Sequence, residues 1–392
     1  MKKVIVKKQA EEKIRYFFPW IYRNEIKKIP DVQPGEIVLI YGTDGSFLGT
    51  GYINPGSVIT VRILSFFKKE DISKEFFRKR IYQSIKKRES LKSFTNAYRL
   101  IHSEGDFLPG LIVDYYGGFL SMQINTAGME RYRNEILEVL IELLNPSGIY
   151  EKSDVKSREK EGLTTREGVL YGNIPEVITI EENDVFFYVN LKESQKTGFY
   201  LDQRKNRQVV SSYVQKDFKV LDLFSNTGGF GIYAFKKGAS FVKFVDVSPK
   251  AVKQLEENCI LNNLTNYQII QEDVFDFLKQ EQRNKNTYNL IVLDPPPFAK
   301  TRREKEGALR GFKYLILNSL KILDEGGYLA VFSCSHHVDM EDLKNISLGA
   351  SKDTKIPVEV VEHLYQDVDH PYILNVPASL YLKGILLRKI SF

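Results

Sequence analysis

Short apolar runs that end in polar residues recur through the second half of the chain. They cover residues 220–223, 241–247, 267–270, 289–293 and 328–332. Continuous apolar runs of this length are typical of strands that a parallel sheet buries on both faces. In such sheets the carboxyl ends of the strands meet at one edge, where ligands bind. The pattern therefore predicts an α/β sheet with five strand ends along one edge.

The first of these strands leads into a glycine turn. Gly228 and Gly229 follow Asp222 and let the backbone turn sharply and approach a ligand closely before a helix begins. The turn lacks the Gly-x-Gly-x-x-Gly pattern that binds dinucleotide phosphates. An acidic strand end beside a looser glycine turn suits a ligand without phosphates, and S-adenosylmethionine (AdoMet) is such a ligand.

The neighbouring strand ends carry the polar groups that AdoMet needs. Asp246 follows the turn at about the 20-residue distance at which an acid usually binds ribose hydroxyls. Asp273 follows the third strand, where a carboxylate can accept a hydrogen bond from the adenine amino group. Residues 196–204 are either a loop that closes over the cofactor or the start of a surface helix. We expect the AdoMet site to comprise Asp222, Phe224, Asn226, Thr227, Gly228, Asp246, Val247, Asp273, Val274, Tyr200, Asp202 and Arg204.

The first 66 residues have a β pattern. Strands are expected at 36–41, 47–53 and 58–64, and Asp44-Gly45 is typical of a hairpin turn. Phe17, Phe18 and Trp20 stand beside a basic cluster, where aromatic rings could stack on bases or simply pack in the core. The pattern predicts a small barrel or sheet.

A second mixed region follows the barrel. The expected elements are a basic amphipathic helix at 69–92, strands at 99–102, 111–114 and 119–122, a helix at 129–144, a mobile charged loop at 151–168 and paired strands at 177–191. Three domains are therefore predicted, at 1–66, 67–192 and 193–392.

Composition and charge narrow the class of protein. The 392 residues include 43% hydrophobic and 27% charged residues, and we find no apolar run near the length of a membrane span. Two cysteines exclude a disulfide framework, and the broken, charged N-terminal sequence does not resemble a signal peptide. We therefore expect a cytoplasmic protein without membrane contact. Residues 1–30 hold nine Lys and Arg against three Glu, and residues 67–92 hold ten against four acidic residues. This charge fits either a nucleic-acid contact or two solvated surfaces.

Several motifs together resemble the RlmI-type ribosomal RNA cytosine-5 methyltransferases, over nearly the whole chain. The motifs are Phe18-Pro19-Trp20, Gly51-Tyr52-Ile53-Asn54-Pro55, Leu108-Pro109-Gly110-Leu111, Lys196–Arg204, Asp222–Phe230, Asp294–Phe298 and Ser333-Cys334-Ser335. The resemblance implies a class I (Rossmann-like) methyltransferase domain, a middle α/β domain and an N-terminal PUA-like β-barrel that binds RNA. It also implies large-subunit ribosomal RNA as the partner. A homodimer is compatible with this.

Cytosine carbon 5 chemistry gives Cys334 and Asp294 their expected roles. Carbon 5 is a weak nucleophile until a thiolate adds to carbon 6, and Cys334 stands at a strand end that faces the cofactor. Asp294 is expected to bind the base edge and stabilise charge on the ring nitrogen. Phe298 is expected to stack on a base that has left its helix, beside Pro295 and Pro296.

Two other functions fit the same residues. Asp294-Pro295-Pro296-Pro297-Phe298 resembles the motif of enzymes that methylate nitrogens, for example guanine N7, by positioning alone, and Cys334 would then be a bystander. A non-catalytic RNA-binding or ribosome-assembly factor is the remaining alternative. No metal site is expected, because the adjacent His336 and His337 lack a third ligand, and Cys259 is expected in a helix core.

Overall fold

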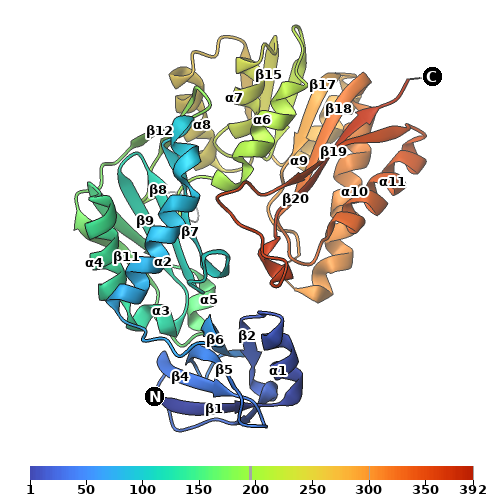
Figure 1. The fold of residues 1–392 in the computed structure, drawn as a ribbon. Coiled ribbons are helices and arrows are strands. Elements are labelled where there is room, and N and C mark those ends of the chain that lie inside the picture. Colours follow the sequence, from blue (N-terminus) through green and yellow to red (C-terminus); the bar gives the residue numbers. More distant parts are fainter. Residues whose placement is uncertain (194–196, 300, 392) are drawn as a thin grey trace. The chain divides into compact units, whose positions relative to one another are not determined.

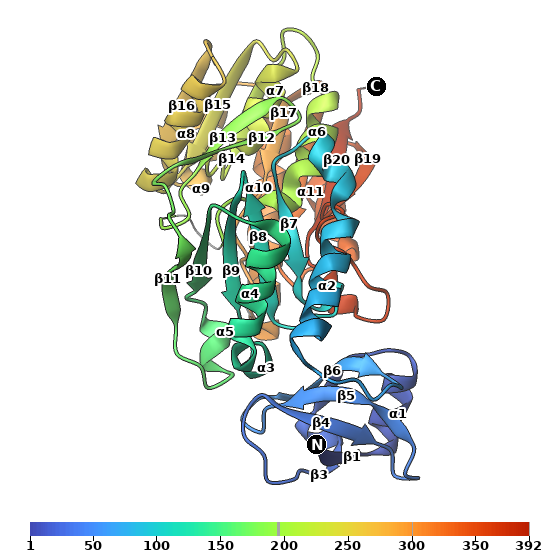
Figure 2. The same ribbon diagram turned by 60° about the vertical axis from the view of Figure 1, so that its left-hand side comes forward.

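The computed structural model describes residues 1–193, 197–299 and 301–391. The chain folds into two compact units, each considered by itself (Figures 1 and 2). The first unit comprises Met1–Ile180, Val189–Leu201 and Val368–Ser379, and the second comprises Glu181–Tyr188, Asp202–Asp367 and Leu380–Phe392. No helix in the described part of the chain has the length and apolar character needed to cross a membrane.

The first unit begins with a six-stranded sheet in the order β2-β6-β5-β4-β1-β3. The predicted hairpin strands are present as β4 (Glu36–Tyr41), β5 (Phe47–Ile53) and β6 (Ile59–Phe66). Four further elements are not evident from the apolar pattern, because charged residues interrupt three of them and β2 is only three residues long. They are β1 (Lys2–Val6), α1 (Lys8–Arg15), β2 (Trp20–Tyr22) and β3 (Ile26–Lys28). β1 pairs with β4 in parallel and with β3 in antiparallel orientation, and it contributes Val4 and Val6 to the barrel core.

A five-stranded sheet follows in the first unit, in the order β11-β10-β9-β8-β7. Its strands are β7 (Ala97–His102), β8 (Leu111–Tyr116), β9 (Phe119–Ile124), β10 (Gly148–Ser153) and β11 (Arg166–Gly172). Helices α2 (Lys74–Lys87) and α4 (Arg133–Leu144) lie on one face of this sheet (Figure 2). Phe77 and Ile81 of α2 and Val139 of α4 share one core with the strands.

Three predictions for this region need correction. The basic helix begins at Lys74 instead of residue 69, and the helix predicted at 129–144 is divided into α3 (Ala127–Arg131) and α4. The predicted mobile loop at 151–168 is wrong, because it contains the end of β10, α5 (Lys156–Glu159) and the start of β11. Its charges are paired: Arg158 lies 3.0 Å from Glu130, and Glu161 lies 3.0 Å from Arg62. The sequence alone does not distinguish charged residues in buried ion pairs of this kind from charged residues on an exposed surface.

Two of the motifs that carry the family resemblance meet in the first unit. The hydroxyl of Tyr52 donates to the carbonyl of Pro109 at 2.8 Å, and its ring is fully buried. A Cβ atom on Gly128 of α3 would lie 2.2 Å from this ring. Asn54 donates its amide to the backbone and carboxylate of Glu161. The two motifs therefore connect the barrel with the five-stranded layer.

The second unit is built on a seven-stranded sheet in the order β16-β15-β14-β17-β18-β20-β19. All five predicted strands are present and mutually parallel, as β14 (Lys219–Leu223), β15 (Phe241–Asp246), β16 (Tyr267–Gln271), β17 (Tyr288–Leu293) and β18 (Leu323–Ser333). β20 (Lys383–Lys389) is antiparallel to β18, and β19 (Val358–Tyr365), which the sequence analysis missed, forms the edge. The chain order reverses between β14 and β17, the position at which such sheets bind ligands.

Helices cover both faces of this sheet (Figure 1). Residues of α9 (Val274–Arg283), α10 (Lys305–Lys321) and α11 (Met340–Thr354) share a core with Leu221 and Leu223 of β14. α7 (Gly229–Lys236) packs on the opposite face, where Gly231 meets Phe244. α6 (Arg204–Ser212) contacts α7, and α8 (Pro249–Leu261) packs beside β15 and β16.

The hairpin predicted at 177–191 is present as β12 (Ile178–Glu182) and β13 (Val185–Val189). Two asparagines hold the β13 backbone: Asn258 of α8 accepts from the amide of Tyr188, and Asn262, which caps the C-terminus of α8, accepts from that of Phe186. Backbone amides at this strand edge thereby obtain hydrogen-bond partners from asparagine side chains.

Replacing Gly128 with alanine should destabilise the first unit. Alanine favours helices by up to about 1 kcal/mol over glycine, but overpacking against the Tyr52 ring costs about 1–3 kcal/mol. Gly307→Ala is the matched control, because Gly307 also lies in a helix and its Cβ would approach only the side chain of Arg310, at 3.9 Å. Denaturant unfolding should show a lower midpoint for Gly128→Ala and an unchanged or higher midpoint for Gly307→Ala. Equal midpoints would contradict the described packing.

Candidate active site

The loop between β14 and α7 has an unusual backbone. Phe224, Asn226 and Gly228 adopt left-handed conformations, with φ of 58°, 46° and 87°. A Cβ on Gly228 would also lie 2.3 Å from Leu255, so only glycine fits there. The buried carboxylate of Asp222 accepts a hydrogen bond from the amide of Gly231 at 2.8 Å. Asp222 therefore ties the strand to the first turn of the helix.

Asp246 fixes the other side of this loop. One of its oxygens accepts from the amide of Asn226 at 2.8 Å, and the other accepts from the amide of Ser248 at 2.9 Å. Asn258 of α8 also donates to the carbonyl of Thr227. The half-buried Asp246 carboxylate is thus held rigidly at the end of β15, where a ribose would be bound.

Negative charge accumulates at this edge of the sheet. The pKa of Asp222 is raised to about 7, chiefly by burial and then by the carboxylates of Asp294 and Asp246, while the Gly231 amide acts in the opposite direction. The carboxylates at the ends of two adjacent strands therefore disfavour ionisation of the Asp222 carboxyl on the strand between them. Such a group favours a cationic ligand, and the sulfonium of AdoMet carries a positive charge.

The end of β16 supplies different kinds of group. Asp273 is exposed and caps α9 by accepting from the amide of Phe275 at 2.8 Å. Val274 is buried in the sheet core, so its side chain does not face solvent. Val247, next to Asp246, is 64% exposed and leaves an apolar surface at the strand ends.

Asp294 stands at the end of β17, and its carboxylate accepts from the side-chain amide of Gln203 at 3.0 Å. Pro295 is buried, whereas Pro296 is exposed. The half-buried ring of Phe298 contacts the rings of Phe224 and Phe312, with centroids at 6.4 and 5.1 Å. Phe298 therefore joins the loop after β17 to the loop after β14.

Cys334 follows β18 and is half-buried between two buried serines. Ser335 donates its hydroxyl to the carbonyl of Ala299 at 2.8 Å, which connects the loops after β17 and β18. Leu293 pairs with Val331, and adjacent strands lie about 4.8 Å apart, so the backbones of Asp294 and Cys334 are about 8 Å apart. Cys334 and Asp294 are thus neighbours at one edge.

Lys383 approaches Cys334 from β20. Its ammonium donates to the carbonyls of Ser335 at 2.7 Å and Tyr381 at 2.9 Å, and the residue is buried. Burial lowers the pKa of Lys383, and negative charge on Cys334 acts in the opposite direction. A buried cation is therefore close enough to interact with the thiol. The sequence analysis missed Lys383 because it depends on strand pairing between distant segments.

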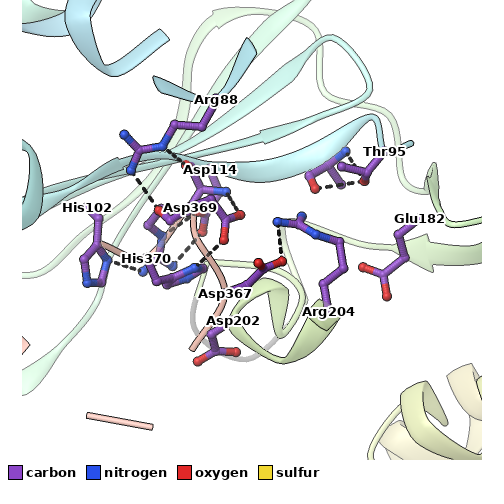
Figure 3. Close-up of polar contacts among 12 residues, drawn as sticks. Arg88, Thr95, His102, Asp114, Glu182, Asp202, Arg204, Asp367, Asp369 and His370 are labelled. Carbon is purple, nitrogen blue, oxygen red and sulfur yellow. Dashed lines mark hydrogen bonds and ion pairs between the residues drawn. The ribbon is translucent and has the colours of Figure 1, made fainter. Parts of the chain in front are cut away.

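Residues 202–204, which precede the seven-stranded sheet in the chain, form an ion pair and hydrogen bonds with later parts of the second unit. Arg204 begins α6 and lies 2.7 Å from Asp367, with both residues buried (Figure 3). Asp202 accepts from the hydroxyl of Tyr381 at 2.7 Å. Tyr200 belongs to the first unit, and Lys196 lies outside the described residues. Gln203, between Asp202 and Arg204, was not predicted.

A buried ion pair supports the helices beneath the glycine turn. Arg207 of α6 lies 2.6 Å from Glu182 of β12, and both side chains are almost fully buried. The Glu182 carboxylate raises the pKa of Arg207 against the effect of burial. A Cβ on Gly229 would lie 3.0 Å from the Arg207 side chain, so this pair packs against the start of α7. No cluster of three metal-binding side chains occurs among the residues that the structure describes.

Comparisons with known proteins agree with this architecture. A family model described as "PUA-like domain" matches residues 4–66, and one described as "Conserved hypothetical protein 95" matches residues 205–355. The "Ribosomal RNA large subunit methyltransferase I" of Tolumonas auensis is 38% identical over 394 residues, covering 99% of each chain. The protein of the same name from Aeromonas salmonicida is 39% identical over 387 residues, covering 97% of this chain and 98% of the relative.

Solved structures show the same fold over the whole chain. SMU.776, described as a methyltransferase complexed with SAH, superposes with a TM-score of 0.86 at 26% identity and covers 99% of this chain and 100% of its own. A methyltransferase structure from Streptococcus mutans superposes with a TM-score of 0.84 at 25% identity, with the same coverage.

Removing the buried acid should change how stability depends on pH. Because the pKa of Asp222 is raised in the folded protein, its ionisation favours unfolding as pH rises from about 4 to about 7. Asp222→Asn keeps an oxygen that accepts from Gly231 but cannot ionise. Without AdoMet, the free energy of unfolding of the wild type should fall relative to the variant by roughly 2–4 kcal/mol over this range. Urea unfolding at a series of pH values measures this, and parallel pH curves would refute the raised pKa.

Proposed function

This chain belongs to the family of the ribosomal RNA large subunit methyltransferases I, and on that premise we propose that it methylates carbon 5 of a cytidine in large-subunit ribosomal RNA. The family confirms the resemblance seen in the motifs, and the chain is an AdoMet-dependent methyltransferase with a PUA-like domain. The relatives' name specifies the RNA and leaves the methylated atom open. The observation that supports carbon 5 is the position of Cys334 at the strand end next to that of Asp294.

The strand-end carboxylates suit AdoMet, which supplies an electrophilic methyl group on a sulfonium. Asp246 would bind the ribose, and the exposed side chain of Val247 would cover the adenine beside Asp273. The left-handed loop from Phe224 to Gly228 brings backbone close to the cofactor. Asp222 would act indirectly, by holding that loop and adding negative charge beneath the sulfonium.

Cys334 would activate the target base. Its thiolate adds to carbon 6 of cytosine, a C–S bond forms, and carbon 5 becomes nucleophilic enough to take the methyl group from the sulfonium. The proton on carbon 5 then passes to a base, the C–S bond breaks, and the thiolate is released. Two easier steps thereby replace one difficult step. The target base must first leave its helix to reach the thiol.

Asp294 would hold the pyrimidine ring during this addition. Electron density moves toward ring nitrogen 3 when the thiolate attacks, and a group that donates or shares a proton there stabilises the charge. Gln203 orients the Asp294 carboxylate through its 3.0 Å hydrogen bond. The packing of Phe298 against Phe224 fixes the same loop relative to the glycine turn.

Lys383 would favour the ionised thiol. A positive charge near a cysteine stabilises the thiolate, which is the reactive form. Lys383 is held by two backbone carbonyls and so keeps a fixed position beside Cys334. Its burial reduces the screening of this interaction by water.

The first unit would bind the RNA, and we assign the domains to 1–66, 67–192 and 193–392. Part of the charge on α2 is already neutralised within the unit, because Lys74 pairs with Glu138 and Glu142 at 2.6 Å. Electrostatic binding by α2 therefore rests on its remaining cations.

Replacing Cys334 with alanine should abolish methyl transfer. Cys259→Ala is the matched control, because Cys259 is the other cysteine, is fully buried in α8 and has its thiol pKa raised to about 12 by burial. Each protein is incubated with AdoMet and unmodified large-subunit ribosomal RNA, and the digested nucleosides are identified by mass spectrometry. The wild type and Cys259→Ala should yield 5-methylcytidine, and Cys334→Ala should yield at least about a thousandfold less. Methylguanosine made equally by Cys334→Ala would contradict the proposal.

Replacing Lys383 with methionine should slow the reaction of Cys334 with alkylating reagents. Methionine preserves much of the buried volume but removes the charge that favours the thiolate. The rate of iodoacetamide alkylation at Cys334, followed at pH 7 by peptide mass spectrometry, should fall about tenfold, while methyl transfer falls in parallel. Lys389→Met serves as a control on the same strand, because the Lys389 ammonium pairs with Glu325 instead. An unchanged alkylation rate in Lys383→Met would exclude this role.

A further inference from the structure

An apolar cavity of about 170 Å³ lies within the first unit, whereas Asp294 and Cys334 belong to the second. Phe17, Pro19 and Phe66 of the barrel form one wall, and Phe107 and Pro109 from the β7–β8 connection form another. Residues 373–376 close a third side. An engineered protein cavity of about 150 Å³ accommodates benzene, so this one is large enough for a flat aromatic ring.

Two phenylalanines of this cavity occupy backbone positions that favour glycine. Phe17 has φ of 62° and follows α1, and Phe107 has φ of 57° and follows the short helix at Ser103–Asp106. Left-handed conformations are costly for bulky residues, and helix ends of this kind usually carry glycine. Both rings are also exposed, Phe17 by 53% and Phe107 by 39%. Backbone strain combined with an exposed apolar ring is typical of a functional site.

Cations surround one of these rings. The guanidinium of Arg80 lies 5.3 Å from the centroid of Phe107, and the ammonium of Lys87, which also pairs with Asp106 at 3.1 Å, lies 6.0 Å from it. Phe17 is held edge-on by Phe66, with centroids 5.5 Å apart. An aromatic platform flanked by Arg and Lys is the arrangement that binds a stacked base and its phosphates.

One carboxylate faces this apolar cavity. Glu104 accepts from the indole N–H of Trp20 at 2.9 Å and from the hydroxyl of Ser103, so its orientation is fixed. A carboxylate accepts hydrogen bonds from exocyclic amino groups, which cytosine, adenine and guanine carry and uracil lacks.

The third wall of the cavity is also preformed. Asn375 donates its amide to the carbonyl of Tyr16, the residue before Phe17. Upstream, the backbone carbonyl of Asp369 accepts a hydrogen bond from Arg88 (Figure 3). The carboxylate of Asp369 accepts one from the backbone amide of Arg99. The buried His370 contacts the same carboxylate at 2.8 Å. Residues 373–376 are therefore held by Asn375 and by the anchored residues Asp369 and His370 that precede them.

We propose that this cavity binds one unpaired nucleobase of the RNA substrate, a base with an exocyclic amino group, at a point separate from the methylated nucleotide. The base stacks on the exposed phenylalanines, donates its amino group to Glu104, and places its phosphates beside Arg80 and Lys87. This inference rests on the proposed function only in taking RNA as the substrate.

Glycine substitutions separate this role from a structural one. In Phe17→Gly and Phe107→Gly the strained backbone relaxes, so the thermal midpoint should stay or rise, while RNA affinity falls. Stacking contributes about 1–3 kcal/mol per base, so each variant should bind labelled oligo-C RNA about fivefold to a hundredfold more weakly by fluorescence anisotropy. Asn263→Gly, at another left-handed position with φ of 58° after α8, is the matched control and should bind as the wild type does.

Base preference tests the contact with Glu104. The wild type should bind oligo-C and oligo-A RNA more tightly than oligo-U RNA, and Glu104→Gln should reduce that difference. Glycine variants that retain wild-type affinity, or that lose affinity and stability together, would overturn the proposal. The proposal would also be overturned if the glycine variants differed from the wild type only in self-association, as measured by sedimentation. Because binding is measured without AdoMet, weaker binding by the variants would support the cavity even if the wild type made no 5-methylcytidine.

Discussion

The parallel pairing of β14 with β15 and β17 forces acidic side chains together, and the site depends on this constraint. Asp222, Asp246 and Asp294 come from three adjacent strands, and burial with mutual repulsion raises the pKa of Asp222 to about 7. Backbone amides at Gly231 and Asn226 offset part of the cost by donating to two of these acids. On the proposed placement of AdoMet, its sulfonium would offset the remaining repulsion at the same edge.

The strands on the two sides of the reversal between β14 and β17 are proposed to have different functions. The ends of β14, β15 and β16 carry the loops that we propose bind AdoMet, whereas the ends of β17 and β18 carry Asp294 and Cys334. These loops contact one another, because the hydroxyl of Ser335 donates to the carbonyl of Ala299 and the ring of Phe298 packs against that of Phe224.

Elements with a continuous apolar pattern are the ones that could be predicted from the sequence. Four of the five parallel strands were predicted to within one residue at each end, because each is a short apolar run bounded by polar residues, whereas β18 begins at Leu323 instead of residue 328. β1 and β3 were missed because lysines interrupt them, and the 151–168 region was taken for a loop because buried ion pairs such as Arg158–Glu130 look like solvated charge. Gln203 and Lys383 were missed because their roles arise from pairing between distant segments, which local patterns do not record.

The central claim concerns the atom that accepts the methyl group, and the fate of the hydrogen on carbon 5 tests it most directly. Large-subunit ribosomal RNA transcribed with cytidine tritiated at carbon 5 is incubated with the protein and AdoMet. If Cys334 activates carbon 5, one tritium should be released to water for each methyl group transferred. Methyl transfer without release of tritium would place the methyl group on another atom and contradict the account.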